Sequence, residues 1–98
     1  MYLVHARLRP PPQGGELPPD LRAFIYECAR PEEGVEHVSV HGDASSAPVL
    51  GLFLLADSLA RAEANAAAVC ARLLEIHPEL PGWTLVRAEA PLLVIDSP

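Results

Sequence analysis

One stretch, residues 49–56, limits the folds open to this chain more than any other. Its sequence, Val-Leu-Gly-Leu-Phe-Leu-Leu-Ala, has large apolar side chains at both odd and even positions. Successive side chains point to opposite faces of a strand, so both faces of this strand need cover. The stretch therefore predicts an interior strand of a sheet, around which the other elements must pack.

The remaining elements follow from periodicity and from the positions of proline and glycine. Three further stretches alternate apolar and polar residues and predict strands: 2–9, 35–41 and 83–90. Two stretches have apolar residues at helical spacing and predict helices: one that begins at Pro18-Pro19-Asp20 and stops before Pro31, and an alanine-rich one that begins at Asp57 or Ser58 and ends before Pro78. Leu92–Ile95 follows as a short apolar tail or strand.

The element order is strand, helix, strand, strand, helix, strand, in a chain whose 98 residues suit one domain. This βαββαβ order resembles that of ferredoxin-like domains. The resemblance is one of architecture over the whole chain. It implies an α+β fold with a four-stranded antiparallel sheet, in the order 4-1-3-2, and with both helices on one face.

With both helices on one face, the other face of the sheet is open. In the strand at 83–90, alternation pairs Trp83 and Leu85 with Arg87 and Glu89 on that face, and in the strand at 35–41 it pairs Val35 with His37, Ser39 and His41. The strand at 49–56 shows the open face either Val49, Gly51, Phe53 and Leu55 or Leu50, Leu52 and Leu54. The apolar residues expected to form an interface are Leu3, Phe53, Trp83, Leu85, Leu92 and Ile95.

An uncovered patch of this kind is uncommon on monomers. In this the chain resembles the dimeric α/β-barrel superfamily of ferredoxin-like proteins, whose facing sheets enclose a pocket. The resemblance implies a homodimer through the open face. A heterologous protein partner is the alternative.

Basic and imidazole side chains gather on the same predicted face, and these are the candidate ligand-binding residues: His5, Arg7, His37, His41 and Arg87. Arginine can orient an anionic or carbonyl-bearing ligand, and histidine can move a proton. The same residues could instead form a structural network with Glu89. A metal site is not expected, because His37 and His41 are roughly 13 Å apart along an extended strand.

Composition narrows the function classes. The net charge of -6 disfavours binding to nucleic acid or to an anionic membrane surface. No signal peptide or apolar span is evident, which favours a cytoplasmic location. Cys28 and Cys70 lie in no CxxC pattern and are expected to be buried thiols, with a disulfide or a catalytic thiol as alternatives. No nucleotide, hydrolase or zinc motif is present, so no cofactor is predicted.

Two functions remain. The favoured one is a non-enzymatic binding or assembly module, a homodimeric accessory or small-molecule-binding protein. The alternative is a cofactor-independent enzyme of the dimeric α/β-barrel kind, of oxygenase, cyclase or isomerase type. In that enzyme His5, His37 or His41 would act as general acid or base. No catalytic residue is assigned in the favoured function.

Overall fold

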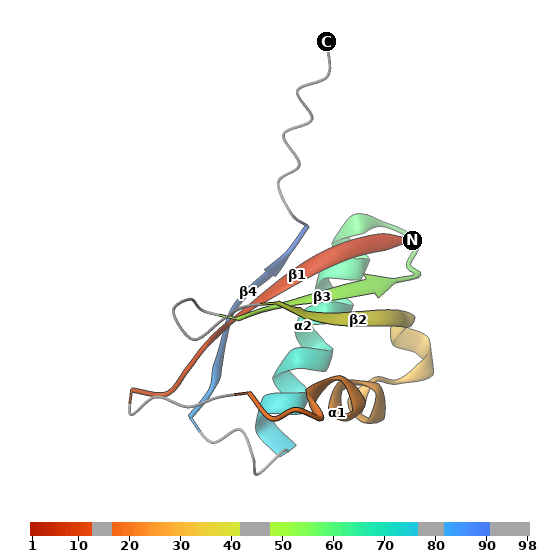
Figure 1. The fold of residues 1–98 in the computed structure, drawn as a ribbon. Helices are drawn as coiled ribbons and strands as arrows, with labels where there is room; N and C mark the ends of the chain where they lie inside the picture. The colour runs from red at the N-terminus through yellow and green to blue at the C-terminus, as the bar shows by residue number, and fades with distance from the viewer. Residues whose placement is uncertain (13–16, 42–47, 77–81, 91–98) are drawn as a thin grey trace.

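A computed structural model describes residues 1–12, 17–41, 48–76 and 82–90. Its elements follow the predicted order (Figure 1): β1 (Tyr2–Arg9), α1 (Leu21–Cys28), the 3-10 turn η1 (Pro31–Glu33), β2 (Val35–His41), β3 (Val49–Leu54), α2 (Leu59–Ile76) and β4 (Thr84–Glu89). The strands form one antiparallel sheet in the order β2-β3-β1-β4. This confirms the predicted strand order, read from the opposite edge. The predicted tail Leu92–Ile95 lies outside the described residues.

β1 and β3 form the centre of the sheet and send alternate side chains into the core. The core side chains of β3 are Leu50, Leu52 and Leu54, all fully buried, which settles the alternative that its sequence left open. Burying a leucine stabilises a fold by roughly 1.5 to 3 kcal/mol, so this row is a large part of the core. The three leucines of β3 belong to one hydrophobic cluster with residues of β1, α1 and α2: Val4, Ala6, Leu8, Leu21, Ile25, Ala62, Ala66, Val69, Cys70 and Leu73.

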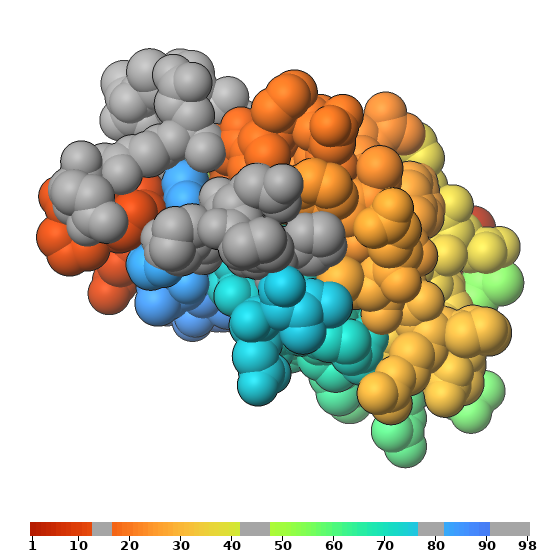
Figure 2. Space-filling view, turned by 90° about the horizontal axis from the view of Figure 1, so that it is seen from below, coloured from red at the N-terminus to blue at the C-terminus, as the bar shows by residue number. Residues whose placement is uncertain are grey.

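The N-terminal cap of α2 and the small side chains on its buried side position this helix against the cluster. Ser58 precedes α2 and its Oγ accepts a hydrogen bond from the Arg61 amide at 3.1 Å, which satisfies one free donor of the first turn. Alanines at positions 62 and 66 keep the buried side of α2 thin, so this helix can approach the sheet closely. The shorter α1 lies beside α2, and Figure 2 shows the orange surface of α1 next to the teal and cyan surface of α2.

We name the side of the sheet opposite the core the outer face. Its side chains alternate with the core residues and are exposed or half-buried apart from Gly51: Leu3, His5, Arg7, Arg9, His37, Ser39, His41, Val49, Gly51, Phe53, Thr84, Arg87 and Glu89.

A β-bulge in β4 corrects the prediction for Trp83 and Leu85. Arg7 is paired with Arg87 but the next residue of β1, Leu8, is paired with Leu85, so Val86 is an extra residue in the ladder. One extra residue reverses the side to which the preceding side chains point. Trp83 and Leu85 therefore pack with the core, where Trp83 is only 7% exposed, while Arg87 and Glu89 stay on the outer face.

A second irregularity lies in β2. Val35 is paired with Leu54 and His37 with Phe53, which leaves Glu36 as the extra residue. Val35 consequently packs against the core and does not share a face with His37, as simple alternation had predicted.

Trp83 provides a direct check of the bulge, because it is the only tryptophan of the chain. We expect Trp83→Ala to lower the free energy of unfolding by about 3 to 5 kcal/mol, the usual cost of truncating a buried tryptophan. Urea denaturation measures this loss. Acrylamide should quench the wild-type fluorescence only weakly, because Trp83 is buried. Efficient quenching in the folded protein would contradict this placement and indicate that Trp83 lies on the outer face.

Candidate functional site

The outer face is organised in rows that run across the strands. One row joins Leu3, Phe53 and His37, the next Glu89, His5, Gly51 and Ser39, and the third Arg87, Arg7, Val49 and His41. The five candidate ligand-binding residues, His5, Arg7, His37, His41 and Arg87, all belong to these rows. The structure thus brings them to one face, and their role in binding stays a prediction.

The first row is the apolar part of the outer face. Leu3 and Phe53 are paired on the central strands, and both are half-buried. The Phe53 ring lies 5.8 Å from the His37 ring, centroid to centroid, at an interplanar angle of 48°. This tilted arrangement is favourable for aromatic rings and holds His37 against the edge of the apolar row.

The second row contains Gly51, whose missing side chain leaves room for the side chain of Ser39. A Cβ at this position would lie 2.6 Å from the Ser39 Oγ and 3.6 Å from the Leu3 Cδ1, so no larger residue fits without a shift. The Ser39 Oγ is 2.9 Å from the His41 Nε2, within hydrogen-bond distance. In the tautomer with an unprotonated Nε2, the imidazole accepts the hydrogen bond from the hydroxyl, which is the arrangement that general-base catalysis uses.

The third row carries the basic side chains. Arg7 and Arg87 are directly opposite each other on neighbouring strands, and both are exposed. The Arg87 Nη1 lies 3.2 Å from the Glu89 Oε1. Both side chains of that ion pair are more than half exposed, so it contributes at most about 1 kcal/mol.

The histidines of the outer face are distributed over all three rows. His37, His5 and His41 occupy the first, second and third row respectively. In the part of the chain that the structure describes, no three His, Cys, Asp or Glu side chains are grouped closely enough to hold a metal ion.

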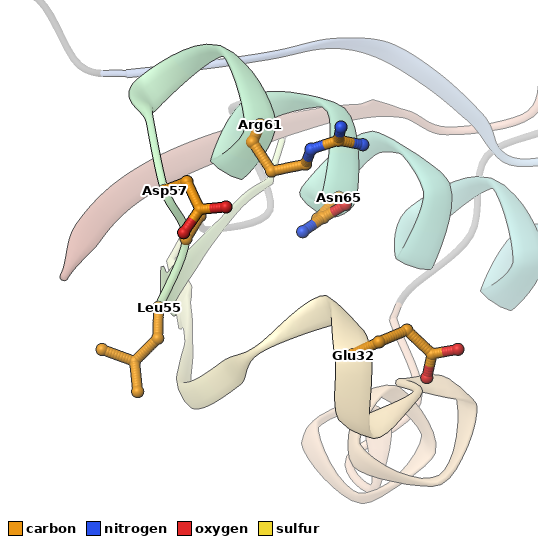
Figure 3. A pocket seen from close by; sticks show the side chains of 6 residues that line it. Glu32, Leu55, Asp57, Arg61 and Asn65 are labelled. Carbon is orange, nitrogen blue, oxygen red and sulfur yellow. The ribbon is translucent and has the colours of Figure 1, made fainter.

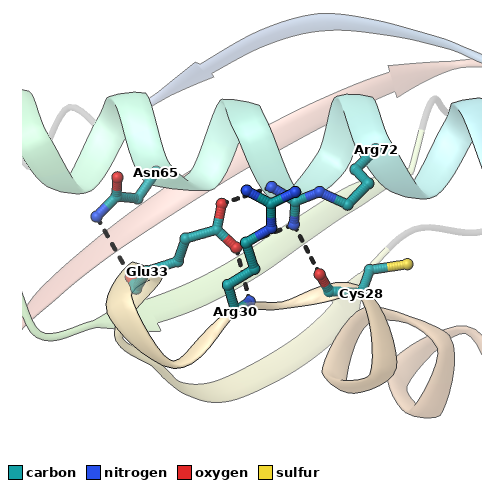
Figure 4. A network of polar contacts seen from close by, with 5 residues as sticks. All are labelled: Cys28, Arg30, Glu33, Asn65 and Arg72. Carbon is teal, nitrogen blue, oxygen red and sulfur yellow. Dashed lines mark hydrogen bonds and ion pairs between the residues drawn. The ribbon is translucent and has the colours of Figure 1, made fainter.

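A polar cluster that the sequence did not predict lies on the other side of the molecule (Figure 4). Arg72 of α2 donates two hydrogen bonds to the Glu33 carboxylate, at 3.0 and 2.8 Å, and one to the Cys28 carbonyl at 2.6 Å. The same carboxylate accepts a hydrogen bond from the Arg30 amide at 2.8 Å. Asn65 donates to the Glu33 carbonyl at 3.4 Å. These contacts join the end of α1 and η1 to α2.

Glu33 is the one buried charged residue of the described chain, and it is fully paired. Hydrogen bonding from Arg72 holds the pKa of Glu33 below its ordinary value of 4.5, against the opposing effect of burial. We interpret this cluster as structural, because its donors and acceptors satisfy one another.

A pocket of about 440 Å³ lies beside this cluster, between η1, the segment after β3 and the first turns of α2 (Figure 3). Its lining residues are Glu32, Leu55, Ala56, Asp57, Arg61 and Asn65. The side chains of Leu55 and Glu32 point outward at its two ends, so they do not converge on a common centre. The Asn65 amide is already used by Glu33. We therefore assign no ligand to this pocket.

The two cysteine thiols are poor nucleophiles in this environment. Cys28 and Cys70 are both free and buried, as the sequence had indicated. Burial raises the pKa of Cys70 to about 12 and also raises the pKa of Cys28 above its ordinary value, so neither forms a thiolate readily at neutral pH.

Comparison with protein-family models, with curated proteins and with solved structures finds no match for this chain. None of the described helices combines the length and the apolar character needed to cross a bilayer.

Glu33 gives a testable pH dependence. A carboxyl whose pKa is lowered on folding stabilises the native state above its unfolded pKa, and the benefit is lost as the pH falls through the folded value. We expect Glu33→Gln to lower the free energy of unfolding by about 1 to 3 kcal/mol at pH 7. The difference from wild type should shrink progressively below about pH 4.5.

Urea denaturation at a series of pH values measures this difference. Glu75→Gln, at an exposed position of α2, is the matched control and should leave stability nearly unchanged. A difference that stays constant from pH 7 down to pH 2 contradicts the assigned role of the Glu33 carboxylate.

Proposed function

We propose that this protein is a binding or assembly module that acts through the outer face and associates there with a second copy of itself. The observation that supports this most is the pairing of half-buried Leu3 and Phe53 on the two central strands, in a sheet face whose other rows are mostly polar and charged. Protein interfaces usually combine a buried apolar patch with polar and charged surroundings.

The proposal includes a ferredoxin-like arrangement in which α1 and α2 both lie on the core face. It is supported by the single hydrophobic cluster, which contains Leu21 and Ile25 of α1 together with Val69 and Leu73 of α2. Those residues pack with the strand side chains that alternate with the outer face. In such an arrangement the described helices leave the outer face to a partner.

The bulge in β4 changes the character of the proposed interface. With Trp83 and Leu85 in the core, its apolar part is reduced to Leu3, Val49 and Phe53, with the exposed Val86 at the edge. An interface built on so small an apolar centre is expected to be reversible, unlike the large apolar interfaces of obligate dimers. A cytoplasmic accessory or small-molecule-binding protein is compatible with such a reversible contact.

Phe53 is the residue to change, because it lies at the centre of the apolar row. Phe53→Arg places a charge there, and we expect it to weaken self-association by a factor of at least about 30, the effect of losing an aromatic interface anchor. Sedimentation velocity over a concentration series measures the association. Leu59→Arg, at an exposed position of α2, is the matched control.

The wild-type protein and Leu59→Arg should associate alike. If Phe53→Arg stays folded by circular dichroism and associates as strongly as wild type, the outer face is not the interface. A heterologous partner, the alternative occupant of this face, is indicated if the wild type is a monomer at all concentrations.

One observation favours the second candidate function, the cofactor-independent enzyme. The Ser39 Oγ and the His41 Nε2 are 2.9 Å apart beside Gly51, within reach for proton transfer. Among the described residues, however, no side chain is hydrogen-bonded to the other nitrogen of His41 to orient it. The binding module therefore remains the better-supported proposal.

A fluorophosphonate probe distinguishes the two functions, because it reacts with serines that a neighbouring base activates. We expect no labelling of Ser39, since this serine is a surface hydroxyl in a binding module. Intact-mass spectrometry after incubation gives the answer. Labelling of the wild type that disappears in His41→Gln but persists in His37→Gln favours the enzyme instead.

A further inference from the structure

Two arginines lie opposite each other on the outer face, although their like charges repel. Arg7 and Arg87 are register partners on β1 and β4, where side chains directly opposite are about 5 Å apart at Cβ. Like charges placed opposite each other destabilise a sheet. A negatively charged group bound between the two guanidinium groups would offset this repulsion.

The charged side chains that the structure describes around this pair do not neutralise it. Arg9 follows on the same face, and Glu89 is the one acidic side chain among the outer-face residues. Glu89 is bound to Arg87 alone, in an exposed ion pair of 3.2 Å, and Arg7 makes no ion pair within the described residues. Arg72, by contrast, is paired with Glu33 through two hydrogen bonds.

This basic surface belongs to an acidic protein. The chain carries a formal net charge of -6 with seven arginines and no lysine, and three of those arginines lie on the outer face. Among the acidic residues that the structure describes, Glu89 alone belongs to the outer-face residues named above. A local surplus of positive charge against the sign of the whole molecule raises the local concentration of anions and favours their capture.

We propose that Arg7 and Arg87 form a binding site for an oxyanion group, a phosphate or a pair of carboxylates, carried by a small ligand. The proposal rests on the proposed function of the outer face as a binding surface and names the class of ligand. A guanidinium presents parallel N–H donors that match the oxygens of such groups, and two opposed guanidinium groups can share one dianion.

The neighbours of the arginine pair suit the rest of such a ligand. Val49 is the register partner of Arg7 on β3, and His41 follows it in the same row on β2. An anionic head between the arginines would place the remainder of the molecule over Val49, toward the apolar Leu3 and Phe53. His41 can donate a further hydrogen bond at the far side of the row.

The anion also removes an obstacle to face-to-face association. Two copies that meet through the outer face bring their arginine pairs into the same interface, and like charges at an interface oppose binding. A bound dianion compensates this repulsion. Oxyanions should accordingly strengthen the self-association as well as bind.

The test is a titration of the ¹⁵N-labelled full chain followed by NMR, with sodium chloride adjusted to keep the ionic strength constant. The two probes are inorganic pyrophosphate and citrate. We expect saturable shifts in the amides of β1 and β4 around Arg7 and Arg87. Arg7→Gln or Arg87→Gln should weaken binding about tenfold, the loss of one charge-assisted hydrogen bond.

Two further variants separate a built site from general charge attraction. Arg22→Gln removes one exposed arginine from α1 and should leave the affinity unchanged. Glu89→Gln frees Arg87 from its ion pair and should strengthen binding, by up to about fivefold. A role of Arg87 that is only structural predicts no such gain.

The two probes distinguish the sources of the oxyanion. Binding of pyrophosphate alone indicates a phosphate-bearing ligand, binding of citrate alone indicates a polycarboxylate, and either result supports the proposal. Weakening by Arg22→Gln to the same extent as by Arg7→Gln overturns it, as does the absence of saturable shifts with both probes. Binding of a polyglutamate peptide without either small anion also overturns it, in favour of an acidic protein segment.

Sedimentation of the same samples keeps this proposal separate from the proposed function. A protein that stays monomeric yet binds pyrophosphate at Arg7 and Arg87 retains the anion site and loses the homodimer. A protein that dimerises through Phe53 without binding either anion shows the reverse.

Discussion

The pairing of β1 with β3 at the centre of the sheet is the constraint on which the rest of the structure depends. It aligns Val4 with Leu52 and Ala6 with Leu50, so that one face of both strands is fully buried. The same register places Leu3 opposite Phe53 and Arg7 opposite Val49 on the outer face. A slip of one residue would exchange the two sets of side chains and expose the leucines, which is why this register is strongly determined.

The outer strands attach to this centre with one bulge each, and the bulges decide what the outer face presents. If Val86 were paired regularly in the ladder, the side of β4 that carries Arg87 and Glu89 would also carry Trp83. The bulge moves the tryptophan into the core and leaves a charged edge. The outer face is therefore less apolar than a regular strand would make it, which is why we propose a reversible, anion-dependent contact and not a large apolar dimer interface.

Much of this could be predicted from the sequence. The element order, the strand order and the position of the apolar strand at the centre follow from alternation, helical periodicity and the prolines. The five candidate ligand-binding residues do lie on one face. The bulges left a signal that simple alternation ignores: in β4 the apolar positions change phase between Leu85 and Ala88, and in β2 they do so between Val35 and Val38.

The cluster around Glu33 could not be predicted in the same way. Glu33 and Arg72 are 39 residues apart and lie on elements whose relative placement no local pattern fixes. Asn65 and the Cys28 carbonyl complete the cluster from two further segments. The close approach of Ser39 and Leu3 to Gly51 is likewise apparent only once the register of the strands is known.

Native mass spectrometry of the protein purified at low salt tests the central claim, that the outer face is a binding surface, most directly. The account predicts a species of about twice the 10.5 kDa chain mass, with additional small-molecule mass retained when the conditions are mild. It predicts that added pyrophosphate increases the fraction of that species. A single chain free of added mass at every concentration, with or without pyrophosphate, contradicts the account.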